Sequence, residues 1–299
     1  MSKTGTQRPL DAALLERLHL PADARKRLRL LRGVLASSDT VSRLAFGKPF
    51  FALREIEALL DRLKGVKGPA LIQTLLEQNG GSRIVPHGLE NVPRHGPALI
   101  AATHPTGMFD FISHAGALAK HRPDLKVVAN RESERFLGAD VMIPVDIDNQ
   151  NRATSARATH LAMKDHLEWD GAILIFGSGR VSNRKSGQLI EPVWRNGTSH
   201  LSKICGTPVI PAALDARNSS YYYRLRRLAQ FLSGGDDNVG AMVGSLRYPA
   251  ELLDQLGGSY EVHYGAPLAP GTKAEVLQSH AEGLVPGLYV GSGDAAGNL

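Results

Sequence analysis

A histidine and an aspartate six residues apart stand where a catalytic pair would be presented. His104 follows the continuous apolar run 98–102, which predicts a buried strand, and Asp110 lies near the start of the next predicted helix. A general base must be held in one tautomer and its imidazolium stabilised, and a nearby carboxylate does both. A tight turn through Pro105 and Gly107 would bring the two side chains together. The spacing favours a His–Asp pair, although a loop histidine beside a helix-start aspartate is its plain structural alternative.

A glycine-rich basic loop is the second candidate. Residues 176–182 read Phe-Gly-Ser-Gly-Arg-Val-Ser and follow the apolar run 172–176. Backbone N–H groups together with the Arg180 guanidinium suit a phosphate. Neither a Walker A nor a dinucleotide glycine pattern is present, and Ser178 lacks the spacing of a hydrolase nucleophile elbow. The loop is therefore interpreted as anion-binding, with a solvated turn as the alternative.

The elements that must position these residues follow an alternating pattern. With 299 residues, 42% of them hydrophobic, the chain can bury a sizeable core. Short apolar runs alternate with helical patterns beyond residue 80, which is typical of βαβ units. The predicted fold class is α/β, with a mixed, largely parallel sheet flanked by helices and a helical N-terminal region. Strands are predicted at 84–85, 98–102, 126–129, 141–145, 172–176, 208–213, 241–246 and 260–264, and helices at 111–120, 153–168, 197–203 and 221–232.

The N-terminal part has a different pattern. Leucines at helical spacing alternate with arginines over residues 25–35, which predicts a basic amphipathic helix, and two further helices are predicted at 51–63 and 70–78. The basic helix is either a packing helix with a solvated arginine face or a helix that lies on a membrane surface. The predicted organisation is a disordered N-terminus at 1–9, a helical basic region at 10–80, an α/β domain at 81–285 and a flexible tail at 286–299.

Charge and cysteine content limit partners and compartment. Lys and Arg exceed Asp and Glu by 35 to 29, and the isoelectric point near 9.5 favours an anionic partner, whether nucleic acid, a membrane surface or an acidic metabolite. The single Cys205 excludes an intramolecular disulfide, and no signal pattern is seen at the N-terminus, so we expect a cytoplasmic location. No apolar segment approaches the roughly 18–20 residues that span a bilayer. We therefore expect that any membrane contact is peripheral.

The order of the motifs resembles the glycerolipid and lysophospholipid acyltransferase superfamily. The resemblance covers residues 84 to about 215: a His-x5-Asp segment, the loop 176–182, and a Val-Ile-Pro strand that follows it. The common superfamily pattern has His-x4-Asp and a Phe-Pro-Glu-Gly-Thr-Arg loop. The longer spacing here looks like the variant branch of lyso-ornithine lipid and haemolysin-like acyltransferases. Where the common loop has Pro-Glu, this chain has Gly177 and Ser178.

The resemblance implies an O-acyltransferase at a membrane surface. His104 would be the general base that removes a proton from a lysolipid hydroxyl, and Asp110 would orient it. The acyl donor would be acyl-CoA or acyl carrier protein, with no metal and no other cofactor. The implied location is the inner face of the membrane, held there by anionic lipid, and no nucleic-acid partner is expected. The implied substrate contacts are Thr106, Gly107, Arg131, Ser178, Gly179, Arg180 and Ser182.

Other functions compete with this one. His104, Asp110 and His114 together form a nitrogen and oxygen set that would suit a divalent metal in a hydrolase. A basic protein that binds lipid or nucleic acid without turnover is a second alternative, although aromatic residues, at 6%, are scarce for base stacking. A third is an acyltransferase fold that binds lipid without turnover, since Ser178 stands in place of the superfamily's glutamate.

Overall fold

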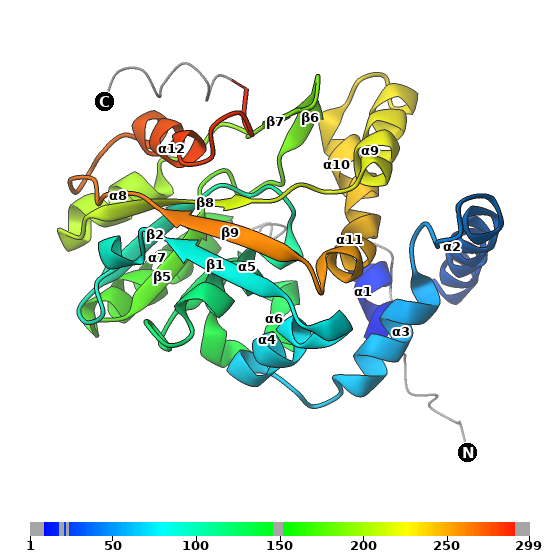
Figure 1. The fold of residues 1–299 in the computed structure, drawn as a ribbon, viewed down its shortest axis with the longest axis horizontal. Helices are drawn as coiled ribbons and strands as arrows, with labels where there is room; N and C mark the ends of the chain where they lie inside the picture. The colour runs from blue at the N-terminus through cyan, green and yellow to red at the C-terminus, as the bar shows by residue number, and fades with distance from the viewer. Residues whose placement is uncertain (1–8, 18–20, 22–23, 146–151, 291–299) are drawn as a thin grey trace. The chain divides into compact units, whose positions relative to one another are not determined.

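The structure is a computed structural model that describes residues 9–17, 21, 24–145 and 152–290. The chain packs into two compact units (Figure 1). One contains residues 1–66 and 218–255, and the other contains residues 67–217 and 256–299. The predicted disordered N-terminus lies outside the described residues except for its last position. The predicted domain boundaries remain a prediction, because these units follow packing and not composition.

The larger unit is built on a seven-stranded sheet of order β1-β9-β8-β2-β5-β3-β4. All neighbouring pairs are parallel except β8 and β9, so the predicted mixed, largely parallel sheet is confirmed. Figure 1 shows α12 on one side of the sheet and α4 on the other. The strands are β1 (Arg83–His87), β2 (Ala98–Ala102), β3 (Lys126–Asn130), β4 (Met142–Val145), β5 (Ala172–Phe176), β8 (Val209–Asp215) and β9 (Ser259–Tyr264).

Helices cover both faces of this sheet and account for its continuous apolar strands. Every residue of β2 is buried, as expected for a central parallel strand covered on both sides. Leu99 and Ala101 share a core cluster with side chains from helices α7, α8 and α12. The helices of this unit are α4 (Gly68–Leu76), α5 (Met108–Leu118), α6 (Glu134–Leu137), α7 (Arg152–Glu168), α8 (Gly197–Cys205) and α12 (Ala274–Gly283).

One predicted strand is wrong. Residues 241–246 lie in helix α10 (Asp237–Gly244) and the following 3-10 turn η5 (Ser245–Arg247). The Asp236 side chain accepts a hydrogen bond from the Asn238 N–H and caps the helix. Gly240 lets α10 approach α9 (Ser220–Leu232) closely, since a Cβ there would lie 2.9 Å from the Arg226 carbonyl oxygen. A short apolar run alone does not distinguish such a helix from a strand.

The predicted flexible tail is packed over its first residues. Residues 286–290 continue into the larger unit, where Leu288 and Tyr289 are buried. The Leu189 N–H donates to the Leu288 carbonyl at 2.8 Å, and the Val290 N–H donates to the Leu189 carbonyl at 2.9 Å. These bonds attach the segment to strand β7 (Gln188–Ile190), which pairs with β6 (Asn183–Lys185) in a hairpin. Residues 291–299 lie outside the described residues.

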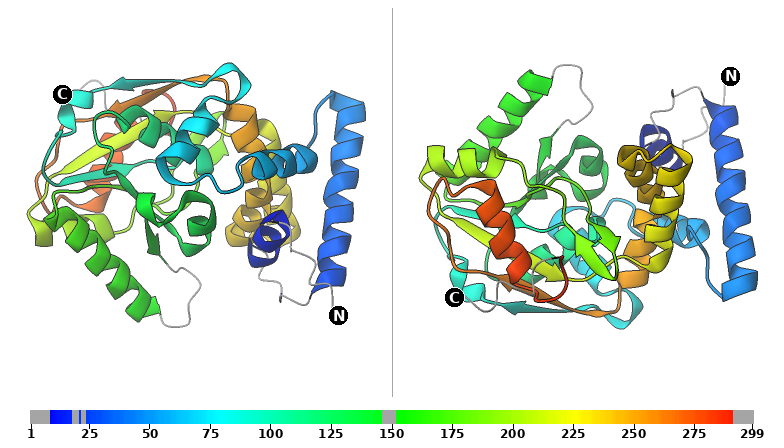
Figure 2. Two further views of the ribbon diagram at one scale, coloured as in Figure 1. Left: turned by 90° about the horizontal axis from the view of Figure 1, so that it is seen from below. Right: turned by 90° about the horizontal axis from the view of Figure 1, so that it is seen from above.

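The smaller unit is helical, as predicted for the N-terminal region. Its helices are α1 (Pro9–Arg17), α2 (Arg25–Phe46), α3 (Leu53–Arg62), α9, α10 and α11 (Tyr248–Gln255). Helix α2 has 22 residues and is straight along its length (Figure 2). Asp39 of α2 is buried and its carboxylate accepts from the N–H groups of Phe51, Ala52 and Leu53 at 2.5, 3.1 and 2.8 Å. It therefore supplies the acceptor that the start of α3 needs.

Candidate active site

The His104 and Asp110 side chains are in contact, as the sequence predicted. His104 Nδ1 lies 2.7 Å from Asp110 Oδ2. The chain turns at Pro105 and at Gly107, whose φ of 99° lies in the region that favours glycine, and then enters α5. Asp110 is in the first turn of that helix and therefore faces back toward the end of β2. With Nδ1 donating to the carboxylate, Nε2 is the ring nitrogen that can accept a proton from a substrate.

Asp110 is held by more than the histidine. Its side chain is fully buried, and its oxygens accept from the Thr106 N–H at 3.1 and 3.0 Å and from the Gly107 N–H at 2.9 Å. The Thr106 hydroxyl also donates to Oδ1. Thr106 and Gly107, predicted as substrate contacts, thus direct their donors to Asp110 in this structure, and a substrate role for them remains a prediction. These donors hold the buried carboxylate in one position beside the histidine ring.

The ring and backbone of His104 are both constrained. The imidazole is stacked on Phe176 of β5, with centroids 4.2 Å apart and planes within 17°. The His104 carbonyl accepts from the Ser182 N–H at 2.8 Å, and the Ser182 hydroxyl lies 3.2 Å from the same oxygen. The side chain is 16% exposed, so one edge of the ring reaches the surface. The arrangement presents a fixed, partly accessible nitrogen base.

The loop after β5 uses its amides within the protein. The Gly177 and Gly179 N–H groups donate to the carbonyls of Ala102 and Phe176, and the Arg180 N–H donates to the Ser178 hydroxyl oxygen. The predicted anion contact at these amides therefore has no support from their geometry. The Arg180 side chain is exposed, and its predicted role as an anion contact remains a prediction.

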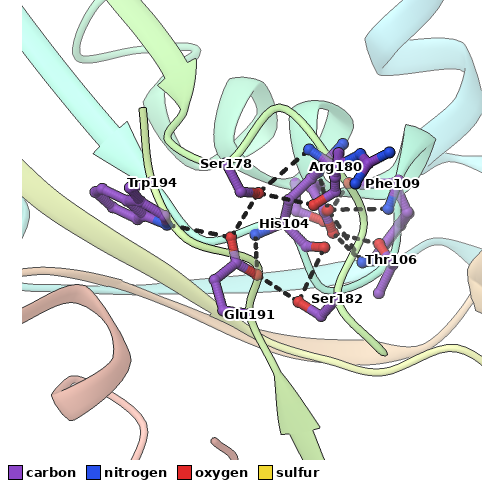
Figure 3. Close-up of polar contacts among 11 residues, drawn as sticks. His104, Thr106, Phe109, Ser178, Arg180, Ser182, Glu191 and Trp194 are labelled. Carbon is purple, nitrogen blue, oxygen red and sulfur yellow. Dashed lines mark hydrogen bonds and ion pairs between the residues drawn. The ribbon is translucent and has the colours of Figure 1, made fainter. Parts of the chain in front are cut away.

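A buried glutamate that the sequence analysis did not identify joins this loop to the histidine. Glu191 Oε2 accepts from the His104 N–H at 3.3 Å and the Ser182 hydroxyl at 2.5 Å (Figure 3). Oε1 accepts from the Ser178 hydroxyl at 2.9 Å and from Trp194 Nε1 at 3.2 Å. Burial raises the pKa of Glu191 to about 7, against the opposing effect of these bonds and of His104. The two serines of the loop are therefore engaged with a carboxyl group.

The signal for this glutamate in the sequence is weak. Glu191 follows the β6–β7 hairpin, whose Ser186 and Gly187 both have positive φ. A Ser-Gly pair between short strands is a hairpin signal, but nothing in the pattern marks the next acid as buried. Gly177 packs against Trp194 so closely that a Cβ would lie 2.1 Å from the indole Cδ2. This contact brings the segment that carries Glu191 beside the loop.

Arg131 lies at the same edge of the sheet as His104. It opens the 3-10 turn η3 (Arg131–Ser133), directly after β3. Because β2, β5 and β3 are parallel neighbours in that order, their carboxyl ends reach one edge. The Arg131 side chain is exposed. This placement is compatible with the predicted substrate contact, which remains a prediction.

The metal alternative at His104, Asp110 and His114 is not supported by the geometry. His114 is buried, its Nδ1 lies 3.2 Å from the Tyr264 hydroxyl, and burial lowers its pKa to about 4. Across the described part of the chain, one group of three possible ligands has donor atoms within 4.8 Å of one another. That group is His87, Glu261 and His263 on the neighbouring strands β1 and β9. It does not include His104.

Comparisons with known proteins bear on this site. The sequence profile of a protein family described as Acyltransferase matches residues 55–282, more than half of the chain. A lyso-glycine lipid O-acyltransferase of Phocaeicola vulgatus is 23% identical over 182 residues, which cover 60% of this chain and 62% of that protein. The chain thus spans less than two thirds of this relative's length. A lyso-glycine lipid O-acyltransferase of Bacteroides thetaiotaomicron is 20% identical over 215 residues, 72% of this chain and 76% of that protein.

A solved structure is also similar. The 1-acyl-sn-glycerophosphate (LPA) acyltransferase of Thermotoga maritima aligns with a TM-score of 0.44 and 15% identity, over 78% of each chain.

Proposed function

The chain belongs to the acyltransferase family, and on that premise we propose that it moves a fatty acyl group from a thioester donor to a hydroxyl of a lysolipid. The observation that carries the proposal is the His104–Asp110 pair, which lies within the matched residues and whose histidine side chain is partly exposed. Two relatives named for O-acylation of lyso-glycine lipid support a lysolipid as the acceptor class.

The proposed reaction uses His104 as a general base. Nε2 takes the proton of the acceptor hydroxyl while the oxygen attacks the thioester carbonyl carbon. The carbon–sulfur bond then breaks, the acyl group remains on the acceptor oxygen, and the protonated His104 returns its proton to the departing thiolate. Asp110 accepts from Nδ1 throughout, so the charged imidazole is stabilised while it exists. The donor is acyl-CoA or acyl carrier protein.

The function is tested by an assay of the purified protein. Radiolabelled acyl-CoA and acyl carrier protein are each offered with lyso-glycine lipid, lyso-ornithine lipid and lysophosphatidate, and the lipid products are separated. We expect an ester product with at least one pairing and none with the His104→Ala protein. If none of these pairings gives an ester product, the proposed function is contradicted. Lipid mass spectrometry of cells with and without the protein identifies the natural acceptor.

We also propose that the protein acts as a peripheral membrane protein, on the inner face. Among the described helices, none is long and apolar enough to cross a bilayer. Helix α2 packs Leu28 and Leu35 into the core of the helical unit. On its opposite side it exposes apolar residues at spacings of four, seven and three, which place them on one helical face. This exposed stripe consists of Leu30, Val34, Val41 and Leu44, which are 55 to 85% accessible.

Cationic side chains adjoin the stripe. Lys26, Arg27 and Arg29 are exposed near the start of α2, whereas Arg32 is occupied by ion pairs with Asp11 and Glu57 at 2.5 Å each. The sequence of this helix is compatible both with a solvated packing face and with a membrane surface. Arg32 fits the first description, and the exposed stripe with its neighbouring cations supports the second. The stripe would enter the acyl boundary while the cations meet lipid phosphates.

Polar substitution of the stripe is expected to weaken membrane binding. The variant Leu30→Ser, Val34→Ser, Val41→Ser and Leu44→Ser removes exposed apolar area, so binding to phosphatidylglycerol vesicles in a sedimentation assay falls by about 100-fold. Changing Lys26, Arg27 and Arg29 to Gln lowers binding to these vesicles more than to phosphatidylcholine vesicles. A matched control, Leu161→Ser with Val193→Ser, alters exposed apolar residues elsewhere and leaves binding unchanged. Equal sedimentation of all variants would contradict the membrane proposal.

A further inference from the structure

Glu191 is a buried acid beside the site that the proposed reaction does not use. Both of its oxygens contact the site: Oε2 binds the His104 N–H and the Ser182 hydroxyl, and Oε1 binds the Ser178 hydroxyl and Trp194. Ser182 in turn donates its N–H to the His104 carbonyl. Both peptide groups around His104 are thus tied to Glu191, one directly and one through a serine. The carboxyl group contacts the backbone of His104 and not its ring, and both of its oxygens accept hydrogen bonds from neighbouring residues.

The hydrogen bonds can be satisfied with Glu191 charged or neutral. Two of the donors, the His104 N–H and the Trp194 N–H, can only donate, and so they favour the charged form. The two serines have a second acceptor each: the Ser178 hydroxyl lies 2.8 Å from the Arg180 carbonyl, and the Ser182 hydroxyl 3.2 Å from that of His104. Either hydroxyl can donate to its carbonyl instead and accept a hydrogen bond from the O–H of a neutral Glu191. Glu191 therefore has hydrogen-bond partners in both its charged and its neutral form.

His104 is the titratable side chain with the largest electrostatic effect on Glu191 among the described residues. Glu191 in turn affects Tyr289, from the C-terminal segment. Burial raises the pKa of Tyr289 well above its usual range, so Tyr289 stays neutral. A charge on Glu191 is therefore felt mainly by His104.

We propose that Glu191 is a positioning residue that acts through His104: its carboxylate holds the His104 backbone and stabilises the charged imidazole that forms when the histidine takes the substrate proton. This inference rests on the proposed function, because that reaction is what places a positive charge on His104 in the transition state. In a buried setting, a carboxylate near a developing positive charge lowers the barrier more than it would in water. The pKa of Glu191 near 7 places the gain and loss of this effect within the working pH range.

The expected result is a pH dependence that one substitution removes. A general base works only in its unprotonated form, so kcat rises with pH in every variant that keeps His104. In the wild-type protein, ionisation of Glu191 through pH 7 adds a further rise of about tenfold, which corresponds to about 1.4 kcal/mol of transition-state stabilisation. Glu191→Gln is neutral at every pH and keeps the shape, so its profile lacks this additional rise. The matched control is Glu282→Gln, a partly buried acid whose pKa is also raised by burial and whose side chain bonds Gln278. It keeps the rise.

A second variant separates this role from a structural one. The Ser182 hydroxyl lowers the pKa of Glu191, so Ser182→Ala raises that pKa and moves the rise in kcat to higher pH. A Glu191→Gln profile that differs from the wild type by the same factor at every pH would overturn the proposal, as would an unmoved midpoint in Ser182→Ala. Infrared spectroscopy detects the protonated carboxyl group of Glu191 without turnover. We expect the wild type to lose this carboxyl band near pH 7, and we expect Glu191→Gln to lack the band. If the wild type shows this band but transfers no acyl group, the proposed function is wrong, whereas the titration of Glu191 is confirmed. If the band is absent, the present inference is wrong and the proposed function is unaffected.

Discussion

Replacing His104 by alanine is expected to lower kcat at least about 10³-fold and to leave KM within a few-fold. A positioned general base contributes about 10²–10⁴-fold. The neighbouring His114 is buried, and its Nδ1 lies beside the Tyr264 hydroxyl, so it is not placed to replace His104. The fold should survive, because Asp110 keeps its bonds from Thr106 and Gly107 when the ring is removed. The measurement is steady-state acyl transfer by the pure variant, with a melting curve beside it.

The control for this variant is another histidine of the same unit. His200 lies on α8 and is exposed, so His200→Ala removes an imidazole without touching the site. It should transfer at the wild-type rate. An intact melting curve with activity within threefold of wild type for His104→Ala would show that the base is a different residue.

Asp110→Asn is expected to cost nearly as much activity and some stability as well. The oxygens of Asp110 face only donors: Oδ2 faces His104 Nδ1 and the Gly107 N–H, and Oδ1 faces both donors of Thr106. An amide NH₂ placed at either position meets an N–H that cannot accept. If the amide NH₂ faces His104, Nδ1 must accept its hydrogen bond, so the ring takes the other tautomer. Nε2 then carries the proton and has no lone pair to accept one from the substrate.

The expected loss in kcat is about 10³-fold, by analogy with the effect of the wrong histidine tautomer in the serine protease triad, and the unpaired buried donor costs about 1–3 kcal/mol of unfolding free energy. Kinetics and denaturant unfolding of the same variant measure the two effects separately. Because the two residues act as one unit, the double variant with His104→Ala should be no slower than His104→Ala alone. Multiplicative losses in the double variant would show that Asp110 acts independently of the histidine.

The strands that carry the site were predictable because they are central and parallel. Runs such as 98–102 and 172–176 are apolar throughout, since both faces of each strand are covered, and such runs end where the chain reaches the sheet edge. The contact between His104 and Asp110 was predictable from the turn residues between them. The family was recognisable from the order of two motifs, one at each of two neighbouring strand ends.

The surroundings of the pair were not predictable, for physical reasons. The burial of Glu191 depends on a hairpin that folds back over the loop and on the Trp194 indole, 15 residues beyond the loop's second glycine, and a linear pattern contains neither. The donors of Thr106 serve Asp110 because of the local turn geometry, which residue types leave undetermined. The apolar run 241–246 was misassigned because a short apolar run that belongs to a helix has the same composition as one that forms a strand.

The close contact between Gly177 and Trp194 limits which residues can replace Gly177 in this chain. A proline at 177, as in the common Phe-Pro-Glu loop, would put its ring where the indole lies, since even a Cβ falls 2.1 Å from that ring. Grafting the common loop into this chain therefore requires a smaller residue at 194 as well. Removing that indole also removes a donor to Glu191. The loop and the segment 191–194 are therefore coupled through packing and hydrogen bonds, so a substitution in one requires a compensating substitution in the other.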